Sequence, residues 1–321
     1  MNQTHAVRMH RFGGPEVLSL DAVPLAPPQA GEAIIRIEAA SVNPVDFKIR
    51  RGEISAVHND QLPYVMGRDF AGVIESLNGD GIGFEPGDKV YGMLNFERGT
   101  YAERALVKVG EMAHRPHRLS AIEAAAVPLA ALTAWQGLFD QGRLCAGQTV
   151  LIHAAAGGVG HLAVQFAKAH GATVIATASG SGLDLLRNLG ADVVIDHEKQ
   201  SFEHIAKNVD LVLDLMGGET QRRSWDVIRE GGALISTIEE PKEEEAHARN
   251  IRAALYWAHT SVVQLDAVRH LIDQGKVRLI VQQVFDLAQA VEAHRLIEAG
   301  HVHGKIVLQM PRAAKWDETF H

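Results

Sequence analysis

The sequence predicts an α/β protein with two parts, an irregular β-rich barrel and a doubly wound parallel sheet. Two observations lead to this prediction. Residues 1–115 read mainly as strands and turns, whereas from residue 148 onward short apolar strands alternate with helical segments. Alternating β and α segments with continuously apolar strands are typical of a parallel sheet covered by helices on both faces. The 321 residues are enough for one or two domains.

The β-rich part is predicted from three apolar runs separated by turn residues. Residues 34–42 form the longest run, and residues 72–74 and 88–92 resemble short strands. Residues 78–88 are rich in Gly, Asp and Asn and connect two of these strands. We expect an irregular β-rich barrel here, not a parallel sheet.

Helices are expected after Ser120. Ser120 and Glu123 have the spacing of a capping box, and an Ala-rich helix follows. Pro128 should interrupt that helix, and residues 133–139 are predicted to form a second one.

The parallel sheet is predicted from five apolar runs. They cover residues 149–155, 172–178, 192–196, 210–215 and 232–237. Residues 158–170 carry apolar side chains with helical spacing, and Gly190 should end the helix after the second strand.

The last part of the chain is predicted to be mixed. Helices are expected at 265–274 and 287–299, and a final strand at 305–309. The charge-dense stretch 238–250 is predicted to be a solvated loop.

The composition excludes several classes of protein. An apolar fraction of 46% excludes a disordered chain. The single cysteine, Cys145, excludes an intramolecular disulfide and fits a reducing compartment. A net charge of −8 without a long basic block disfavours nucleic acid as a partner. No apolar stretch has the length of a signal peptide or a membrane span, so we expect a cytoplasmic protein without a membrane partner.

A glycine-rich turn predicts a dinucleotide site. Residues 153–160 (HAAAGGVG) lie between a predicted strand and a predicted helix. Gly157 would let a pyrophosphate approach the backbone, Gly160 would allow close helix–strand packing, and the helix N-terminus favours an anion. The residues expected to bind the cofactor here are Ala155, Gly157, Gly158, Val159 and Gly160. The alternative is a packing turn of small residues.

The end of the second predicted strand indicates which dinucleotide binds. NAD sites usually place Asp or Glu there, but this chain has hydroxyl and glycine residues at 177–182. The sequence therefore predicts NADPH, with Thr177, Ser179, Ser181, Arg187 and His197 near the 2′-phosphate. Arg187 could equally be an ordinary surface charge.

Seven stretches carry a resemblance to a known family. They are SVNPVDFKIRRG (41–52), GRDFAGVI (67–74), GDKVYGM (87–93), GTYAERALV (99–107), AAVPLAALTAW (125–135), HAAAGGVG (153–160) and HGKIVL (303–308). In this order they resemble the zinc-free medium-chain dehydrogenase/reductases, in particular the quinone oxidoreductase (zeta-crystallin-like) branch.

The resemblance implies a Rossmann domain inserted into a catalytic domain like chaperonin-10 (GroES-like). We expect the catalytic domain at 1–120 plus 261–321 and the NADP-binding domain at 121–260. Family members are commonly dimers or tetramers, and we expect a homodimer. Asp46 stands near the place of the zinc branch's cysteine, and Gly67-Arg68-Asp69 replaces its G-H-E motif, so no metal is expected.

The resemblance also implies residues near the nicotinamide. Asn43 is the first expected contact of cofactor or substrate, and Thr133 matches a Thr at the nicotinamide ribose or carboxamide. The other matches at cofactor-lining positions are Met216, Gly217, Thr237 and Lys305. Lys305 could equally form a strand-end salt bridge. Lys48 replaces a common Tyr and could stabilise an enolate or merely face solvent.

The sequence therefore predicts an NADPH-dependent oxidoreductase. It would transfer hydride to a quinone or to the activated C=C of an α,β-unsaturated carbonyl, without a metal. The alternatives are an NADPH-binding sensor or crystallin-like structural protein with little turnover, and a zinc alcohol dehydrogenase. The retention of Asn43 and Thr133 favours an active enzyme, and the missing ligands disfavour zinc.

Overall fold

The structure divides the chain into two compact units. It is a computed structural model that describes residues 3–311. The β-rich unit runs up to Leu129, includes Thr260–Asp273 and resumes at Val281. The parallel-sheet unit consists of Ala130–His259 and Gln274–Ile280. Its first residue lies nine positions after the predicted boundary of 121, because α2 (Ala121–Ala125) packs on strands of the β-rich unit.

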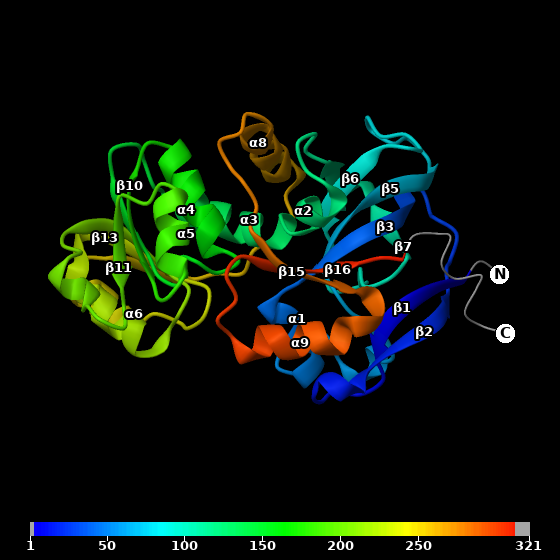
Figure 1. The fold of residues 1–321 in the computed structure, drawn as a ribbon, viewed down its shortest axis with the longest axis horizontal. Coiled ribbons are helices and arrows are strands. Elements are labelled where there is room, and N and C mark those ends of the chain that lie inside the picture. The colour runs from blue at the N-terminus through cyan, green and yellow to red at the C-terminus, as the bar shows by residue number, and fades with distance from the viewer. Residues whose placement is uncertain (1–2, 312–321) are drawn as a thin grey trace. The chain divides into compact units, whose positions relative to one another are not determined.

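Two sheets form the β-rich unit (Figure 1). The larger has the order β15-β16-β3-β5-β6-β8, with β7 paired to β3. Its strands are β3 (Glu32–Val42), β5 (Asp69–Asn78), β6 (Lys89–Met93), β7 (Arg104–Lys108), β8 (Met112–His114), β15 (Val281–Asp286) and β16 (Lys305–Gln309). The smaller sheet has the order β2-β1-β4, from β1 (Gln3–Met9), β2 (Leu18–Pro24) and β4 (Tyr64–Val65). The predicted strands at 34–42, 72–74 and 305–309 all lie within observed strands, and the one predicted at 88–92 corresponds to β6, which begins at Lys89.

The pairing of β16 with β3 brings together segments from the first and the last part of the chain. β16 runs antiparallel to β3, with Ile306 opposite Val42. This register places Lys305 beside the end of β3, where Asn43 begins the next helix. The core below this sheet consists of fully buried side chains that include Ile35, Phe70 and Tyr101.

The first helix of the β-rich unit is not among the predicted elements. Residues after β3 were assigned to strands and turns, but α1 spans Pro44–Arg51. Pro44 occupies its first turn, where no backbone donor is lost, and Gly52 ends it with φ 78°. The other helices of this unit are α2, α8 (Val262–Asp273) and α9 (Ala290–Ala299), and α9 packs against α1.

Helix α3 passes from the first unit into the second. It spans Pro128–Trp135 and continues into a π-helical segment at Gln136–Gln141. The prediction that the second helix starts at residue 133 was wrong. Pro128 ends α2 as expected, but it also begins α3, because its fixed φ suits the first helical position.

The parallel-sheet unit has the strand order β11-β10-β9-β12-β13-β14, and every neighbouring pair is parallel. The strands are β9 (Thr149–Ile152), β10 (Thr173–Ala178), β11 (Val193–Asp196), β12 (Val209–Asp214), β13 (Ile228–Ser236) and β14 (Arg252–Leu255). In chain order this is 3-2-1-4-5-6, the doubly wound arrangement. The order reverses between β9 and β12, so a ligand site is expected at the carboxyl ends of these strands.

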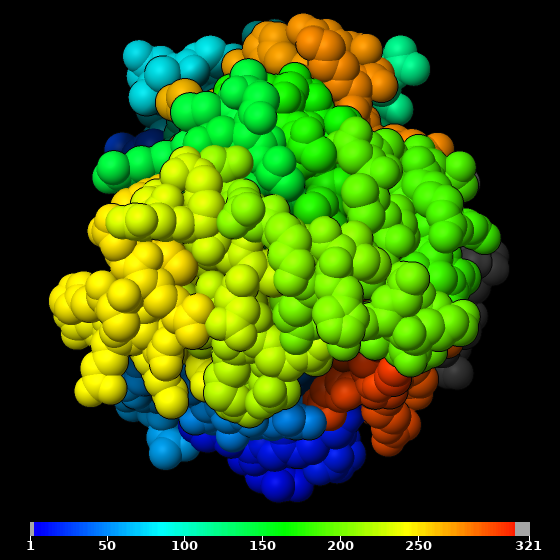
Figure 2. All heavy atoms as spheres, turned by 90° about the vertical axis from the view of Figure 1, so that its left-hand side faces the viewer, coloured from blue at the N-terminus to red at the C-terminus, as the bar shows by residue number. Residues whose placement is uncertain are grey.

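Helices α4 (Gly160–Ala169), α5 (Gly182–Asn188), α6 (Gly218–Ser224) and α7 (Glu243–Ala248) connect these strands. The prediction that 238–250 is only a loop was wrong, because α7 lies within it. Ala246 is the buried residue of α7. Figure 2 shows this part of the chain in yellow at the surface of the molecule. Short 3₁₀ helices occur at Pro15–Val17, Asn59–Gln61, Val109–Glu111, Phe202–His204, Trp225–Val227 and Leu287–Gln289.

Candidate functional site

The glycine-rich turn has the geometry of a dinucleotide cradle. β9 ends at Ile152, three residues earlier than predicted, and α4 begins at Gly160. A Cβ added at Gly157 would meet only the Ala154 carbonyl oxygen, at 3.3 Å. A Cβ added at Gly160 would lie 2.5 Å from the Ala155 Cα, so this glycine is required for the helix to pack on the strand. Gly157 precedes a helix N-terminus, whose N–H groups and dipole suit a pyrophosphate.

The hydroxyl of Thr177 points into the core. Thr177 is buried and lies 3.1 Å from His153 Nδ1, while His153 Nε2 lies 3.0 Å from Ser224 Oγ. Ser224 donates its own proton to the Thr220 carbonyl, so it accepts from His153, and Thr177 donates to Nδ1. Burial lowers the pKa of His153 to about 4, which keeps the ring neutral. The Thr177 side chain therefore hydrogen-bonds within the core at the end of β10.

The polar residues beyond Thr177 lie at or near the surface. Ser179 is half-buried, and Ser181 and His197 are exposed. Arg187 is exposed on α5 and forms an ion pair of 2.6 Å with Asp184, one turn earlier on the same helix. No acidic residue follows β10 before α5 begins.

Asp214 organises the loop after β12, although it is not among the predicted site residues. Its Oδ1 accepts hydrogen bonds from the backbone N–H groups of Met216 (3.0 Å) and Gly217 (2.9 Å). Its Oδ2 accepts from Gln221 (3.0 Å) and Ser236 (2.9 Å). Gly217 has φ 70°, a conformation that requires glycine, and Met216 is left 52% exposed. Asp214 could have been predicted from the sequence as an acidic residue at the end of an apolar strand.

Thr237 follows β13 directly, and its N–H donates to the Asp214 carbonyl at 3.2 Å. The parallel-sheet unit therefore gathers the predicted turn, Met216, Gly217 and Thr237 at the carboxyl ends of its strands. Thr133 also belongs to this unit and is buried on α3.

A second buried cluster lies in the β-rich unit around Asn43. The Lys305 ammonium contacts Asn43 Oδ1 and lies 3.9 Å from Asp69 Oδ2. Asn43 Nδ2 donates to Asp69 Oδ2 at 2.9 Å, and Ser41 donates to the same oxygen at 2.8 Å. All four side chains are at most 3% exposed. Lys305, the first residue of β16, thus forms a strand-end salt bridge with Asp69 and also holds Asn43, which lies 262 positions away in the sequence.

Asp69 also fixes the beginning of α3. Its Oδ1 accepts from the Leu129 N–H at 2.8 Å, as an N-cap supplied by a distant strand. Burial raises the pKa of Asp69, and the ammonium of Lys305 opposes this shift. Asp69 therefore accepts hydrogen bonds from both Asn43 and the first turn of α3.

Asp46 lies in the first turn of α1 and is fully buried. Its Oδ2 accepts from the Asn43 N–H (2.7 Å) and from the Tyr101 hydroxyl (3.0 Å), whereas its Oδ1 has no hydrogen-bond partner within residues 3–311. Burial, with a contribution from Asp69, raises the pKa of Asp46 to about 7. Lys48 follows on the same helix and is half-buried.

We expect Asp46→Asn to flatten the dependence of stability on pH. An unfolded Asp titrates near pH 4, so between about pH 4 and 7 the folded protein binds more protons than the unfolded chain. Stability from this group is therefore lost as pH rises. Between pH 5 and 8 the unfolding free energy of the wild type should fall by about 2–3 kcal/mol relative to that of the variant. Urea denaturation at both pH values measures this. Asp60→Asn, at an exposed position, should follow the wild type, and parallel curves for Asp46→Asn would contradict the assignment.

The donor set around Asp46 does not suit a zinc ion. The charged groups that act on Asp46 are the Asp69 carboxylate and the cations Lys305 and Arg68, and the Arg68 guanidinium packs 4.2 Å from the centre of the Phe96 ring. Within residues 3–311, no three His, Cys, Asp or Glu side chains are grouped so that they could hold a metal ion. No helix in the same range is long and apolar enough to cross a membrane.

Both parts of the chain match known families. Residues 29–117 match the alcohol dehydrogenase GroES-like domain, and residues 189–308 match a domain described as zinc-binding dehydrogenase. The chain is 33% identical to the NAD(P)H oxidoreductase RTN4IP1, mitochondrial, of Danio rerio, with 87% of this chain and 84% of the relative covered. It is also 33% identical to the 2-methylene-furan-3-one reductase of Solanum lycopersicum, with 92% and 76% covered.

Solved structures agree with these matches. The quinone oxidoreductase from Coxiella burnetii is 35% identical, with a TM-score of 0.89 and 97% of this chain and 100% of that chain covered. The Escherichia coli quinone oxidoreductase complexed with NADPH is 26% identical, with a TM-score of 0.86 and 95% and 99% covered. The predicted combination of a GroES-like domain with a Rossmann-type parallel sheet is confirmed. The chain belongs to the quinone oxidoreductase branch of the medium-chain dehydrogenase/reductase family.

Proposed function

We propose that this protein is an NADPH-dependent oxidoreductase that transfers hydride to a quinone or to the activated C=C of an α,β-unsaturated carbonyl, without a resident metal. The observation that carries the proposal is the glycine-rich turn that contains Gly157, between β9 and α4 at the point where the strand order reverses. The relatives named for quinone and enone reduction support the choice of substrate class.

The preference for NADPH rests on the end of β10. Hydroxyl and glycine residues at 179–182 stand where NAD sites usually carry an acid. A carboxylate there would repel a 2′-phosphate, whereas Ser179, Ser181 and the His197 imidazole can donate to it. Arg187 could add a cation by exchanging its Asp184 partner for the phosphate. The structural relative bound to NADPH supports this choice.

In this mechanism the chain's own residues bind the cofactor and orient the substrate. When bound, the reduced nicotinamide supplies the hydride. Oxyanion character that develops on the substrate needs a nearby donor. We assign this catalytic role to Lys48 on α1 and to Asn43 at the start of that helix, whose amide Lys305 and Asp69 hold in one orientation. Thr133 contacts the nicotinamide part of the cofactor, and Asp69 fixes the N-terminus of its helix.

We expect oxidation of NADPH in the presence of 1,2- or 1,4-quinones or enals, with kcat/KM for NADPH at least about tenfold above that for NADH. The decrease of NADPH absorbance measures turnover, and calorimetry measures binding. Tight NADPH binding without oxidation by any acceptor would instead favour the sensor or structural role. Equal affinity for both cofactors would contradict the assignment of the 2′-phosphate contacts.

The oligomeric state and cell compartment remain predictions. The family resemblance supports a homodimer, for which sedimentation equilibrium should give twice the chain mass of 34.8 kDa. A monomeric mass would contradict it.

A further inference from the structure

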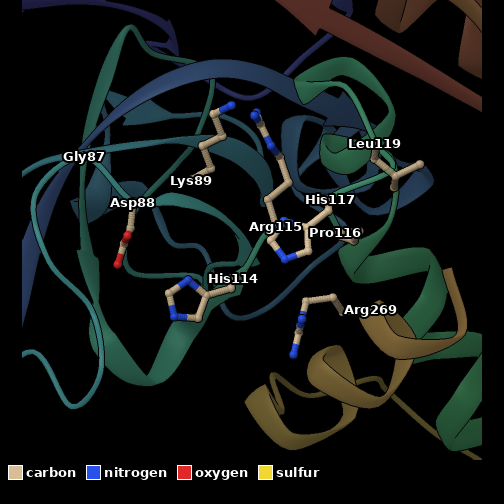
Figure 3. A pocket seen from close by; sticks show the side chains of 9 residues that line it. All are labelled: Gly87, Asp88, Lys89, His114, Arg115, Pro116, His117, Leu119 and Arg269. Atoms are coloured by element: carbon tan, nitrogen blue, oxygen red, sulfur yellow. The ribbon is translucent and has the colours of Figure 1, made fainter. Parts of the chain in front are cut away.

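A pocket of about 540 Å³ lies within the β-rich unit (Figure 3). The loop before β6, the first residue of β6, the segment that begins at the end of β8 and helix α8 form its wall. None of the residues assigned above to cofactor or hydride transfer lines it. Its volume falls in the range of about 300–1,000 Å³ that is usual for small-molecule sites.

Cations dominate the lining of this pocket. Lys89, Arg115 and Arg269 face it together with two histidines, and Asp88 is its one lining carboxylate. The Asp88 carboxylate accepts the Glu85 N–H at 2.9 Å, and in Figure 3 it points away from Lys89 and Arg115. The concentration of cations is notable in a chain with a net charge of −8.

Carboxylates outside the lining hold both guanidinium groups in place. Arg115 donates to Glu38 at 2.9 Å and is 9% exposed, and Arg269 donates to Asp266 at 2.8 Å. A guanidinium has five N–H donors, and the single bond to Glu38 leaves other Arg115 donors available to a ligand. The two arginines are therefore preorganised, which lowers the cost of binding an anion.

Lys89 adds a cation that has no carboxylate of its own within residues 3–311. Its carbonyl accepts the Arg115 N–H at 2.9 Å, so the two residues are neighbours across β6 and the end of β8. Figure 3 shows both side chains extending in the same direction. Like charges at such positions repel each other, and a bound anion would relieve that repulsion.

Two imidazoles complete the wall. His114 lies at the end of β8, where its ring packs on Phe84 with 4.6 Å between centroids and its Nε2 lies 3.2 Å from the Gly83 carbonyl. His117 follows three residues later, and Figure 3 shows it near Arg115 and opposite Arg269. Both rings can donate hydrogen bonds to oxygen atoms.

We propose that this pocket binds a small oxyanion with two or more negative charges, carried by phosphate or carboxylate groups. Guanidinium and ammonium donors form their strongest hydrogen bonds with these groups. The site is separate from the proposed hydride-transfer function and would exist in the protein even if that function were wrong.

Titration calorimetry of the full chain with pyrophosphate and with citrate tests this, against NaCl at matched ionic strength. We expect binding tighter than about 1 mM for at least one of the two probes. Binding of pyrophosphate alone indicates a phosphate ligand, and binding of citrate alone indicates a carboxylate ligand. Lys89→Gln and His117→Gln should each weaken it by about tenfold. Lys207→Gln, at an exposed position of the other unit, should leave it unchanged.

Gly157→Asp serves as the control for the glycine-rich turn. If pyrophosphate binds there instead, this variant will abolish binding while Lys89→Gln retains it, which would overturn the proposal. Failure of both probes to bind more tightly than about 1 mM would overturn it as well. Neither result depends on oxidoreductase activity, so the two proposals fail separately.

Discussion

Gly157→Asp should reduce NADPH affinity by at least about a hundredfold while leaving the fold intact. The added carboxylate would stand where the pyrophosphate approaches, and like charges at close range in a shielded site cost several kcal/mol. The fold should tolerate the change with a small local shift, because an added Cβ makes one tight contact, with the Ala154 oxygen at 3.3 Å, and none below 3.0 Å. Calorimetry with NADPH and thermal unfolding of the same sample measure the two effects.

Gly160→Ala is the matched control because it should have the opposite effect. Its Cβ would lie 2.5 Å from the Ala155 Cα, and backbone atoms cannot move aside cheaply. We expect a loss of about 1–3 kcal/mol in stability, typical of overpacking. A Gly157→Asp variant that still binds NADPH with unchanged affinity would show that this turn is only a packing motif.

Lys305→Met should destabilise the β-rich unit by about 3–5 kcal/mol at pH 8. Methionine fills similar space, but its loss of charge leaves Asp69 buried without its nearest cation, and such uncompensated charges are costly. The loss should be smaller at pH 5. Burial already raises the pKa of Asp69, and without Lys305 this carboxyl will be protonated more readily. Urea denaturation at both pH values measures the difference.

Lys207→Met, at an exposed position, should change stability by less than about 0.5 kcal/mol at either pH. A loss below about 1 kcal/mol for Lys305→Met at pH 8 would mean that the Asn43 cluster does not depend on its cation. The kcat of the variant adds a second readout, since Asn43 would lose the partner that orients its amide oxygen.

Local patterns were sufficient to predict most of the fold. Every predicted strand of the parallel sheet is present, because each is a short apolar run between helical segments. The Ser120 capping box is also present, with the Ser120 hydroxyl accepting the Glu123 N–H. Helix α1 was missed because it is short, half of its eight residues are charged, and it lies within a β-rich region. Asn43 and Pro44 were the available start signals.

Only part of the candidate site could be predicted from local sequence patterns. The glycine-rich turn is contiguous, so its strand, glycines and helix could be recognised from residues 149–170 alone. Asp214 could not be ranked above other acids, since its four hydrogen bonds come from two separate segments that fold around it. The inward direction of the Thr177 hydroxyl likewise depends on His153 and Ser224, which the chain alone does not show to be neighbours.

The sequence by itself determined the two-part architecture, the position of the dinucleotide turn and the absence of an acid at the end of β10, because each is a local pattern of burial or residue type. Only the tertiary structure decided that Lys305 holds Asn43. That contact depends on the register of β16 against β3, with Ile306 opposite Val42. Strand register is set by pairing over long sequence separations, which no local propensity encodes. For the same reason Asp69 reaches the N-terminus of α3 only once the sheet has formed.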